Sequence, residues 1–254
     1  MGAIVLPPTE IVARVLPWVQ RGIDLLYPRN CQLCGTPQAE ADAGVLCGGC
    51  HERVAYLAPP FCQRCALPFD GAVDGMFECG YCRDLPFHFA RAVAGCRAKG
   101  VVRDCIHRFK YDRAMYFGAH LAEWIVMAGR QWIDWATVDA VVPVPLHSRK
   151  KRHRQFNQAE YLADAVGKVF LKPVLTTAVR RVRDTKTQTR LDAAARRENL
   201  RSAFAVRRAA AVAGYRVVLV DDVFTTGATL DACAKVLHQA GAANVVVLTV
   251  ARGV

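Results

Sequence analysis

Four C-x-x-C pairs between residues 31 and 82 constrain this chain of 254 residues more than any other feature of its sequence. Their cysteines are Cys31, Cys34, Cys47, Cys50, Cys62, Cys65, Cys79 and Cys82. A C-x-x-C turn brings two thiolates onto one zinc ion, and two such turns complete a tetrahedron with bonds of about 2.3 Å. The regular spacing, with 12 residues between the first two pairs and 13 between the last two, predicts two structural four-cysteine zinc sites.

Redox-active cysteine pairs are the main alternative to zinc. Such a pair usually opens a helix in a βαβ unit, and none of these four pairs is placed in that way. The total of 11 cysteines is odd, which does not suit a closed disulfide framework. The spacing leaves open whether each site is built from successive or from crossed pairs. Because about 60 residues with a thin core fold only with help, metal binding should be coupled to folding here.

The pattern of apolar residues divides the chain into three parts. Residues 1–27 contain an N-terminal amphipathic helix, 28–88 form a loop-rich double zinc ribbon, and 89–254 alternate between strands and helices. Several of the strands are continuous runs of Val and Leu, which favours an α/β fold with a parallel sheet and helices on both faces. Strands are predicted at 92–94, 138–144, 176–182, 203–206, 216–220 and 244–250, and helices at 100–109, 114–133, 156–170 and 227–240.

Composition excludes two classes of protein. Hydrophobic residues make up 53% of the chain and charged residues 22%, so disorder is not its dominant state. No apolar run reaches the roughly 18 residues that a membrane span needs. The N-terminus lacks the basic-then-apolar order of a signal peptide. We therefore expect a soluble cytoplasmic protein.

The sharpest motif follows the predicted strand at 216–220. Two acids, Asp221 and Asp222, come first, and the turn that opens the next helix consists of Thr225, Thr226, Gly227, Ala228 and Thr229. Free N–H groups at a helix start, together with threonine hydroxyls, bind a phosphate, whereas carboxylates suit ribose hydroxyls or Mg²⁺. We expect a side chain at Gly227 to displace the ligand and spare the strand.

This stretch resembles the phosphoribosyl-pyrophosphate (PRPP) motif of type I phosphoribosyltransferases, with its four hydrophobic residues, two acids and T-T/S-G-x-T turn. It is not a Walker A loop, because no G-K-[ST] is present. The resemblance implies a type I phosphoribosyltransferase-like sheet that binds PRPP with Mg²⁺. The acids would hold the ribose diol and the metal as catalytic residues, and residues 225–229 would hold the 5′-phosphate.

A second resemblance covers nearly the whole chain. Cysteine pairs ahead of a phosphoribosyltransferase-like domain are similar to the ComF family of competence proteins. The family's V-P-V-P-L…R-G-F-N-Q-A is matched at 142–146 and 156–159, except that Gln155 stands where the family usually has Gly. Further similar segments are Phe109-Lys110-Tyr111, Thr185-x-x-Gln188, and Arg197-Glu198-Asn199 with Phe204. The resemblance implies a PRPP-type site and a role in handling incoming DNA during natural transformation.

The whole chain carries a net charge of +12, and its positive charge is concentrated in one part. Residues 96–213 contain 24 lysines and arginines against 10 acids, so the remaining residues sum to slightly negative. This distribution implies an anionic partner, either a phosphorylated small molecule or the backbone of single-stranded DNA. Two segments dominate, 147–154 and 180–208, and the second resembles the flexible loop of phosphoribosyltransferases. Candidates for contact with pyrophosphate or for this loop are Pro145, Arg149, Arg152, Arg154, Lys186, Gln188 and Arg197.

Two functions remain compatible with these features. The favoured one is a cytoplasmic competence factor that binds PRPP or a related phosphate, carries single-stranded DNA on its basic face, and docks its zinc ribbons to competence or DNA-processing proteins. The alternative is an active phosphoribosyltransferase with an unknown acceptor. A PRPP-sensing regulator is less favoured, because no helix-turn-helix is visible. The sequence names neither the acceptor nor the oligomeric state.

Purified protein should contain about two zinc ions per chain, as two four-cysteine sites require. Replacing Cys62 by Ser should lower the zinc content and destabilise residues 28–88, because loss of a ligand uncouples metal binding from folding. Elemental analysis and intact mass together measure this. Protein that carries disulfides and no zinc would contradict the interpretation.

Overall fold

The computed structural model describes residues 30–37, 45–73, 75, 77–85, 87–147, 152, 154–183, 203–207 and 209–253. The chain forms two compact units, Met1–Arg53 and Val54–Val254. The amphipathic helix predicted within residues 1–27 lies outside the described residues. Among the helices that are described, none has both the length and the apolar character needed to cross a membrane.

In the described residues of the smaller unit the helix is α2 (Gly48–Glu52). The elements of the larger unit are, in chain order, α3 (Gly80–Arg83), β1 (Arg91–Arg97), α4 (Gly100–Tyr111), η1 (Met115–Phe117), α5 (Gly118–Trp132), η2 (Trp135–Thr137), β2 (Ala140–Pro143), α7 (Gln158–Phe170), β3 (Val179–Arg181), β4 (Phe204–Val206), η3 (Ala209–Ala211), β5 (Arg216–Phe224), α9 (Ala228–Gln239) and β6 (Asn244–Arg252).

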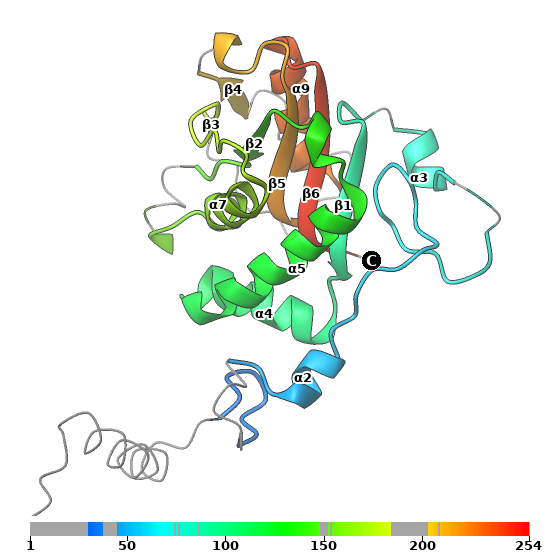
Figure 1. Ribbon diagram of the computed structural model, residues 1–254, viewed down its shortest axis with the longest axis vertical. Helices are drawn as coiled ribbons and strands as arrows, with labels where there is room; N and C mark the ends of the chain where they lie inside the picture. Colours follow the sequence, from blue (N-terminus) through cyan, green and yellow to red (C-terminus); the bar gives the residue numbers. More distant parts are fainter. Residues whose placement is uncertain are drawn as a thin grey trace, which may run out of the picture. The chain divides into compact units, whose positions relative to one another are not determined.

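A four-stranded parallel sheet lies at the centre of the larger unit, in the order β1-β6-β5-β2 (Figure 1). The two central strands, β5 and β6, are nearly continuous runs of buried apolar residues, as expected for strands that are covered on both faces. Helices α5 and α7 contact one side of the sheet, and α9 packs behind it (Figure 1). The predicted α/β fold with helices on both faces is therefore confirmed.

A small antiparallel hairpin of β3 and β4 packs against α9 and accompanies the sheet. Its register pairs Val179 with Val206 and Arg181 with Phe204. The polar stretch between the two strands lies outside the described residues. The hairpin adds Val179 and Phe204 to the same buried cluster as Leu230 of α9, so it is part of the core.

The strand that carries the acids is longer than its sequence predicts. The apolar run suggested a strand at 216–220 that ends before Asp221. In the structure β5 continues to Phe224, because its ladder with β6 extends through Asp221↔Thr249 to Phe224↔Arg252. Neighbouring residues of a strand point to opposite faces, so the two carboxylates diverge instead of lining one surface.

The second cysteine cluster belongs to the core of the larger unit. Cys62, Cys65 and Cys82 are buried in one cluster with Phe87 and with the apolar face of α9. The domain boundaries predicted at 27/28 and 88/89 stay predictions. The second ribbon packs against the same sheet and helix that carry the Asp221–Thr229 motif.

Candidate phosphate-binding and zinc sites

The eight paired cysteines form two clusters, each built from successive pairs. One cluster is Cys31, Cys34, Cys47 and Cys50, the other is Cys62, Cys65, Cys79 and Cys82, and the sulfur atoms of each lie within 4.8 Å of one another. The Sγ–Sγ distances between pairs are 3.6 and 3.7 Å in the first cluster and 3.7 Å twice in the second. Thiolates around one tetrahedral zinc ion would be about 3.8 Å apart. The clusters therefore fit zinc, and the crossed pairing is excluded.

The two ribbons repeat the same local hydrogen bonds. Cys31 N–H donates to Thr36 O at 2.8 Å, and Cys62 N–H donates to Leu67 O at the same distance. In each ribbon the third cysteine also donates its N–H to the Sγ of the first, at 3.4 Å for Cys47 and 3.3 Å for Cys79. Such bonds orient the sulfur and favour its thiolate form. The doubled cysteine spacing thus reflects a doubled structural unit.

The turn after β5 leads directly into α9, with Gly227 as the N-cap at φ +76°. A Cβ on Gly227 would lie 2.6 Å from the Phe224 ring and 3.1 Å from Phe87. The expectation that a side chain here spares the strand is therefore wrong, because Phe224 is the last residue of β5. Thr225, which is exposed, offers a cleaner position for substitution.

The carbonyl groups of this turn accept hydrogen bonds, whereas its first three amides donate none to a described residue. Arg252 Nη1 donates to Phe224 O at 3.2 Å and to Thr225 O at 2.8 Å, and the Tyr81 hydroxyl donates to Thr226 O at 3.0 Å. In the described part of the chain, the N–H groups of Thr225, Thr226 and Gly227 have no acceptor. Unbonded amides at a helix N-terminus are a site for an anion, as the motif predicts.

The two acids lie in different surroundings. Asp222 is buried, and its Oδ2 forms an ion pair with Nζ of Lys110 at the end of α4. Asp221 is partly buried, and its Oδ1 accepts the N–H of Asp222 at 2.9 Å. Sequence reasoning noted Lys110 only as part of a family-like segment. Its partnership with Asp222 spans 112 positions of the chain, so no local pattern could reveal it.

Burial sets the protonation of this region. It raises the pKa of Asp221 to about 6, although the positive charges of Lys110, Arg181 and Arg154 act in the opposite direction. Burial also lowers the pKa of Lys110 to about 8, against the favourable field of Asp221. Three basic residues from α4, from β3 and from the loop before α7 therefore act on one carboxylate. This arrangement can attract a phosphorylated ligand and respond to pH near neutrality.

The loop between β2 and α7 reaches the same region. The Arg154 guanidinium lies 4.7 Å from the centre of the Tyr111 ring, next to Lys110 in sequence. Asn157 holds the end of the loop, since its Nδ2 donates to Val144 O and its Oδ1 accepts the N–H of Ala159, both at 3.1 Å. Gln155 has φ +68°, a left-handed conformation that glycine adopts without strain. The family's usual Gly at this position thus has a backbone reason.

The structure describes only some of the remaining predicted site residues. Pro145 is buried two residues after the end of β2, and Arg152 is exposed. Thr226 is partly buried in the turn, Ala228 is buried at the first position of α9, and Thr229 is partly buried at the second. Four predicted candidates, Arg149, Lys186, Gln188 and Arg197, lie outside the described residues.

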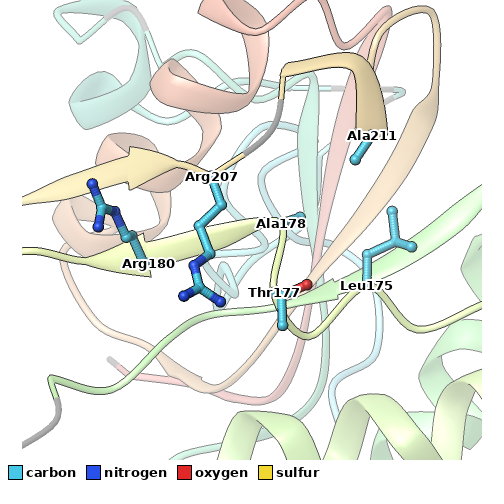
Figure 2. Close-up of a pocket in the computed structure, with 6 residues that line it drawn as sticks. All are labelled: Leu175, Thr177, Ala178, Arg180, Arg207 and Ala211. Atoms are coloured by element: carbon cyan, nitrogen blue, oxygen red, sulfur yellow. The ribbon is translucent and has the colours of Figure 1, made fainter.

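A separate basic hollow of about 650 Å³ lies beside the β3–β4 hairpin (Figure 2). Its lining residues are Leu175, Thr177, Ala178, Arg180, Arg207 and Ala211. Arg180 pairs with Ala205, and Arg207 N–H bonds to Ala178 O, so the two arginines are diagonal neighbours on one face of the hairpin. Within the described residues neither arginine has a carboxylate partner.

Family models assign the two parts of the chain. Residues 22–85 match a double zinc ribbon domain, and residues 153–253 match a phosphoribosyl transferase domain. The class of protein is thus a double zinc ribbon joined to a phosphoribosyltransferase fold, in agreement with the two cysteine clusters and the parallel sheet.

Curated relatives identify the family. The DNA utilization protein YhgH of Salmonella typhimurium is 32% identical over 90% of this chain and 99% of its own length. Competence protein F of Haemophilus influenzae is 30% identical over 82% of this chain and 90% of its own. The chain belongs to the ComF family of competence proteins. Among solved structures, glutamine PRPP amidotransferase of B. subtilis aligns at a TM-score of 0.34 with 20% identity, covering 51% of this chain and 25% of that one, too distant a likeness to carry an argument.

Loss of the Lys110 charge should destabilise the protein, because Asp222 would become a buried carboxylate without a counter-charge. We expect Lys110→Met to lower the free energy of unfolding by about 3–5 kcal/mol. Adding Asp222→Asn to that variant should recover much of the loss. Chemical denaturation of the four proteins in this double-mutant cycle measures the coupling, and simply additive losses would show that the pair does not interact.

Proposed function

We propose that this protein is a cytoplasmic binding protein for PRPP with Mg²⁺ and for single-stranded DNA, acting in DNA uptake and natural transformation. The observation that carries the proposal is the set of amides at 225–227 that have no acceptor among the described residues, next to two acids and a convergence of basic residues. The relatives named for competence and for DNA utilization support the biological role. The zinc ribbons would dock to competence or DNA-processing proteins.

Different parts of PRPP would contact protein groups of different charge. The amides and hydroxyls of the 225–229 turn would bind the 5′-phosphate, and the 145–154 loop with Arg154 would bind the pyrophosphate. The motif implies that the acids face the ribose diol, and because Asp222 lies on the opposite face of β5 and is paired with Lys110, this role would fall to Asp221. Because Lys110 already neutralises Asp222, Asp221 is the carboxylate with more capacity for a further positive partner.

Carboxylate oxygens are suitable ligands for Mg²⁺, so the chemistry of the acids fits the metal. Bound with PRPP, Mg²⁺ would neutralise charge on the pyrophosphate. The protein's own contribution would be to orient the ribose through Asp221 and to hold the phosphates through backbone amides and Arg154. Both contributions serve binding, and both would also serve catalysis.

An active phosphoribosyltransferase is the second candidate function, favoured by the match of residues 153–253 to that domain. Catalysis would then depend on positioning and on electrostatic stabilisation of the departing pyrophosphate. The two candidates share the PRPP site and differ in whether the bond to pyrophosphate is broken. Pyrophosphate release during incubation with PRPP, Mg²⁺ and nucleobases or amines distinguishes them.

Asp221→Asn should weaken binding of PRPP with Mg²⁺ by about 1–3 kcal/mol, the usual scale for a lost charge-assisted contact. Because the pKa of Asp221 is raised to about 6, wild-type affinity should also fall as protonation removes the carboxylate charge below that pH. The variant should show a flatter pH profile. Calorimetry between about pH 5 and about pH 8 measures both effects, with the titration of PRPP itself common to both proteins.

The matched control is Asp104→Asn, which removes an exposed carboxylate from α4 that pairs only with its neighbour Arg103 in the described chain. It should leave PRPP affinity and its pH profile unchanged. Thr225→Val offers a second test of the turn that avoids Phe224. If PRPP affinity survives both Asp221→Asn and Thr225→Val, the motif is a structural turn and the proposed ligand is wrong.

The basic hollow supports the DNA part of the proposal. Arg180 and Arg207 come from the two ends of the 180–208 segment, which the sequence assigns to single-stranded DNA, and the fold places them side by side (Figure 2). Two guanidinium groups that form no salt bridge with a described carboxylate can bind a backbone phosphate, and Thr177 adds a hydroxyl donor. The apolar floor at Leu175 and Ala178 suits the adjoining sugar.

Replacing both Arg180 and Arg207 by Ala should weaken binding of a short single-stranded oligonucleotide and reduce its dependence on salt. Loss of two phosphate contacts should lower the slope of log K against log salt by about 1.4. The control is Arg103→Ala with Arg130→Ala, which removes the same charge from exposed positions on α4 and α5. Fluorescence anisotropy over a range of salt measures the slopes. Equal salt slopes for the two double variants would show that DNA does not bind in the hollow. The 147–154 segment would then be the remaining candidate for DNA binding.

A further inference from the structure

One arginine links the second zinc ribbon to the phosphate-binding turn. Arg252, the last residue of β6, is only 5% exposed. On one side, its Nε donates to Cys65 O at 2.8 Å and its Nη2 lies 3.9 Å from Cys65 Sγ. On the other side, its Nη1 donates to Thr225 O and Phe224 O, and its guanidinium stacks 4.6 Å above the Phe224 ring. A zinc ligand and the phosphate-binding turn thus share one side chain.

This buried charge needs a counter-charge. Among the described residues, no carboxylate forms a salt bridge with Arg252. Carbonyl oxygens satisfy its N–H groups but do not neutralise it. Four thiolates on one Zn²⁺ carry a net charge of −2, and Cys65 is one of those four ligands. The metal-bound cluster is therefore a negative group in direct contact with the Arg252 guanidinium.

The contacts of this arginine also determine which way the turn faces. In a trans peptide the C=O of one residue and the N–H of the next point in opposite directions. Arg252 holds the carbonyls of Phe224 and Thr225 on the ribbon side, and Tyr81 of α3 holds that of Thr226. The N–H groups of the residues that follow them, Thr225, Thr226 and Gly227, must then point away from the ribbon. Those are the amides that have no acceptor in the described chain.

The ribbon makes a second attachment one helical turn further on. The backbone N–H of His88 donates to Asp231 Oδ1 of α9 at 2.6 Å, and the His88 ring Nδ1 lies 3.0 Å from the same oxygen. Phe87 stacks on Phe89 and packs edge-on against Phe224, and it lies 3.1 Å from the position that a Cβ on Gly227 would take. Residues 62–88 therefore contact the end of β5, the turn and the start of α9.

We propose that the second zinc ribbon supports the phosphate-binding turn, with Arg252 and Tyr81 as positioning residues that couple zinc at Cys62, Cys65, Cys79 and Cys82 to the orientation of the turn amides. Zinc at this site keeps Arg252 in place, and Arg252 keeps the carbonyls turned away from the anion. Coupling of binding free energies is reciprocal, so an anion on the turn strengthens the binding of this zinc and should retard its removal by a chelator. That last consequence rests on the proposed PRPP function, whereas the coupling of zinc to the turn does not.

The first ribbon provides a matched control within the same chain. Arg53 Nη2 donates to Cys50 Sγ at 3.2 Å and its Nε donates to Gly49 O at 2.9 Å, so it too is an arginine that serves a cysteine cluster. Unlike Arg252, it is exposed and bonds within its own ribbon. Arg53→Met should therefore affect only the zinc of the first site.

The test needs no phosphate ligand. Full-length wild type, Arg252→Met, Tyr81→Phe and Arg53→Met are treated with a zinc chelator. The newly accessible thiols are alkylated and assigned peptide by peptide, while hydrogen–deuterium exchange follows residues 223–233. We expect Arg252→Met to speed zinc loss from the second site, and amide exchange in 223–233, by at least about fivefold, the lower range of measured couplings. Removal of that zinc from wild type should produce the same change in exchange.

Tyr81→Phe keeps the ring and removes one hydroxyl, so it tests the proposal even if Arg252→Met folds poorly. It should increase exchange at the start of α9 with little effect on zinc loss. Arg53→Met should leave 223–233 unchanged. Two results would overturn the proposed coupling. One is equal amide exchange in residues 223–233 of wild type with and without the second zinc. The other is exchange in Arg252→Met and in Tyr81→Phe that is no faster than in Arg53→Met.

A second arm adds PRPP with Mg²⁺ to the chelation experiment on the wild-type protein. Slower zinc loss from the second site, with no change at the first, would support both the coupling and the PRPP site. No effect of PRPP, together with zinc-dependent exchange in 223–233, would support the coupling and count against PRPP as the ligand. The two hypotheses therefore fail separately.

Discussion

The parallel pairing of β5 with β6 continues past the apolar residues that begin it, and much of the site depends on this extension. It carries Asp221 and Asp222 inside the strand and ends at the pair Phe224↔Arg252. That register brings the last residue of β6 next to the start of the 225–229 turn. A shift of one residue would exchange the faces of both acids and move Arg252 away from the turn carbonyls.

The divergence of the two acids divides the charge of the site between two environments. Asp222 is buried against Lys110, so its charge is largely balanced within the protein. Asp221 feels the field of the same Lys110 together with those of Arg181 and Arg154, and these fields do not fully offset its desolvation. A pair of adjacent acids in the sequence thus becomes one structural ion pair and one carboxylate with a raised pKa. The second kind of group is common at functional sites.

The two zinc ribbons have the same internal bonds and different surroundings. In the first, Arg53 bonds to Cys50 Sγ and to Gly49 O of the same ribbon. In the second, Arg252 comes from 187 positions away in the chain and bonds to both the ribbon and the turn. One copy of a duplicated motif has therefore been built into the core of the phosphoribosyltransferase fold, together with Phe87 and α9.

Several features were determined by local sequence alone. The C-x-x-C spacing predicts two zinc sites because each pair needs only a short turn, and the match at 22–85 together with the two clusters bears this out. The order of strands and helices predicts a parallel α/β fold, since periodicity and Val-rich runs are local signals. The T-T-G-A-T turn is a short contiguous motif, so the sequence could locate it without knowledge of its neighbours.

Other features were decided only by the tertiary structure. The end of β5 depended on its ladder with β6, and the pairing of Asp222 depended on a lysine at the end of α4. The steric effect of a side chain at Gly227 depended on the rings of Phe224 and Phe87. The choice between successive and crossed cysteine pairs, and the role of Arg252, likewise required the chain to be folded. Each of these is a contact between segments far apart in sequence, and such contacts leave no periodic or local pattern. The sequence by itself therefore determined the kinds of site this protein contains, whereas the packing of β6, α4 and the second ribbon against β5 decided how those sites are connected.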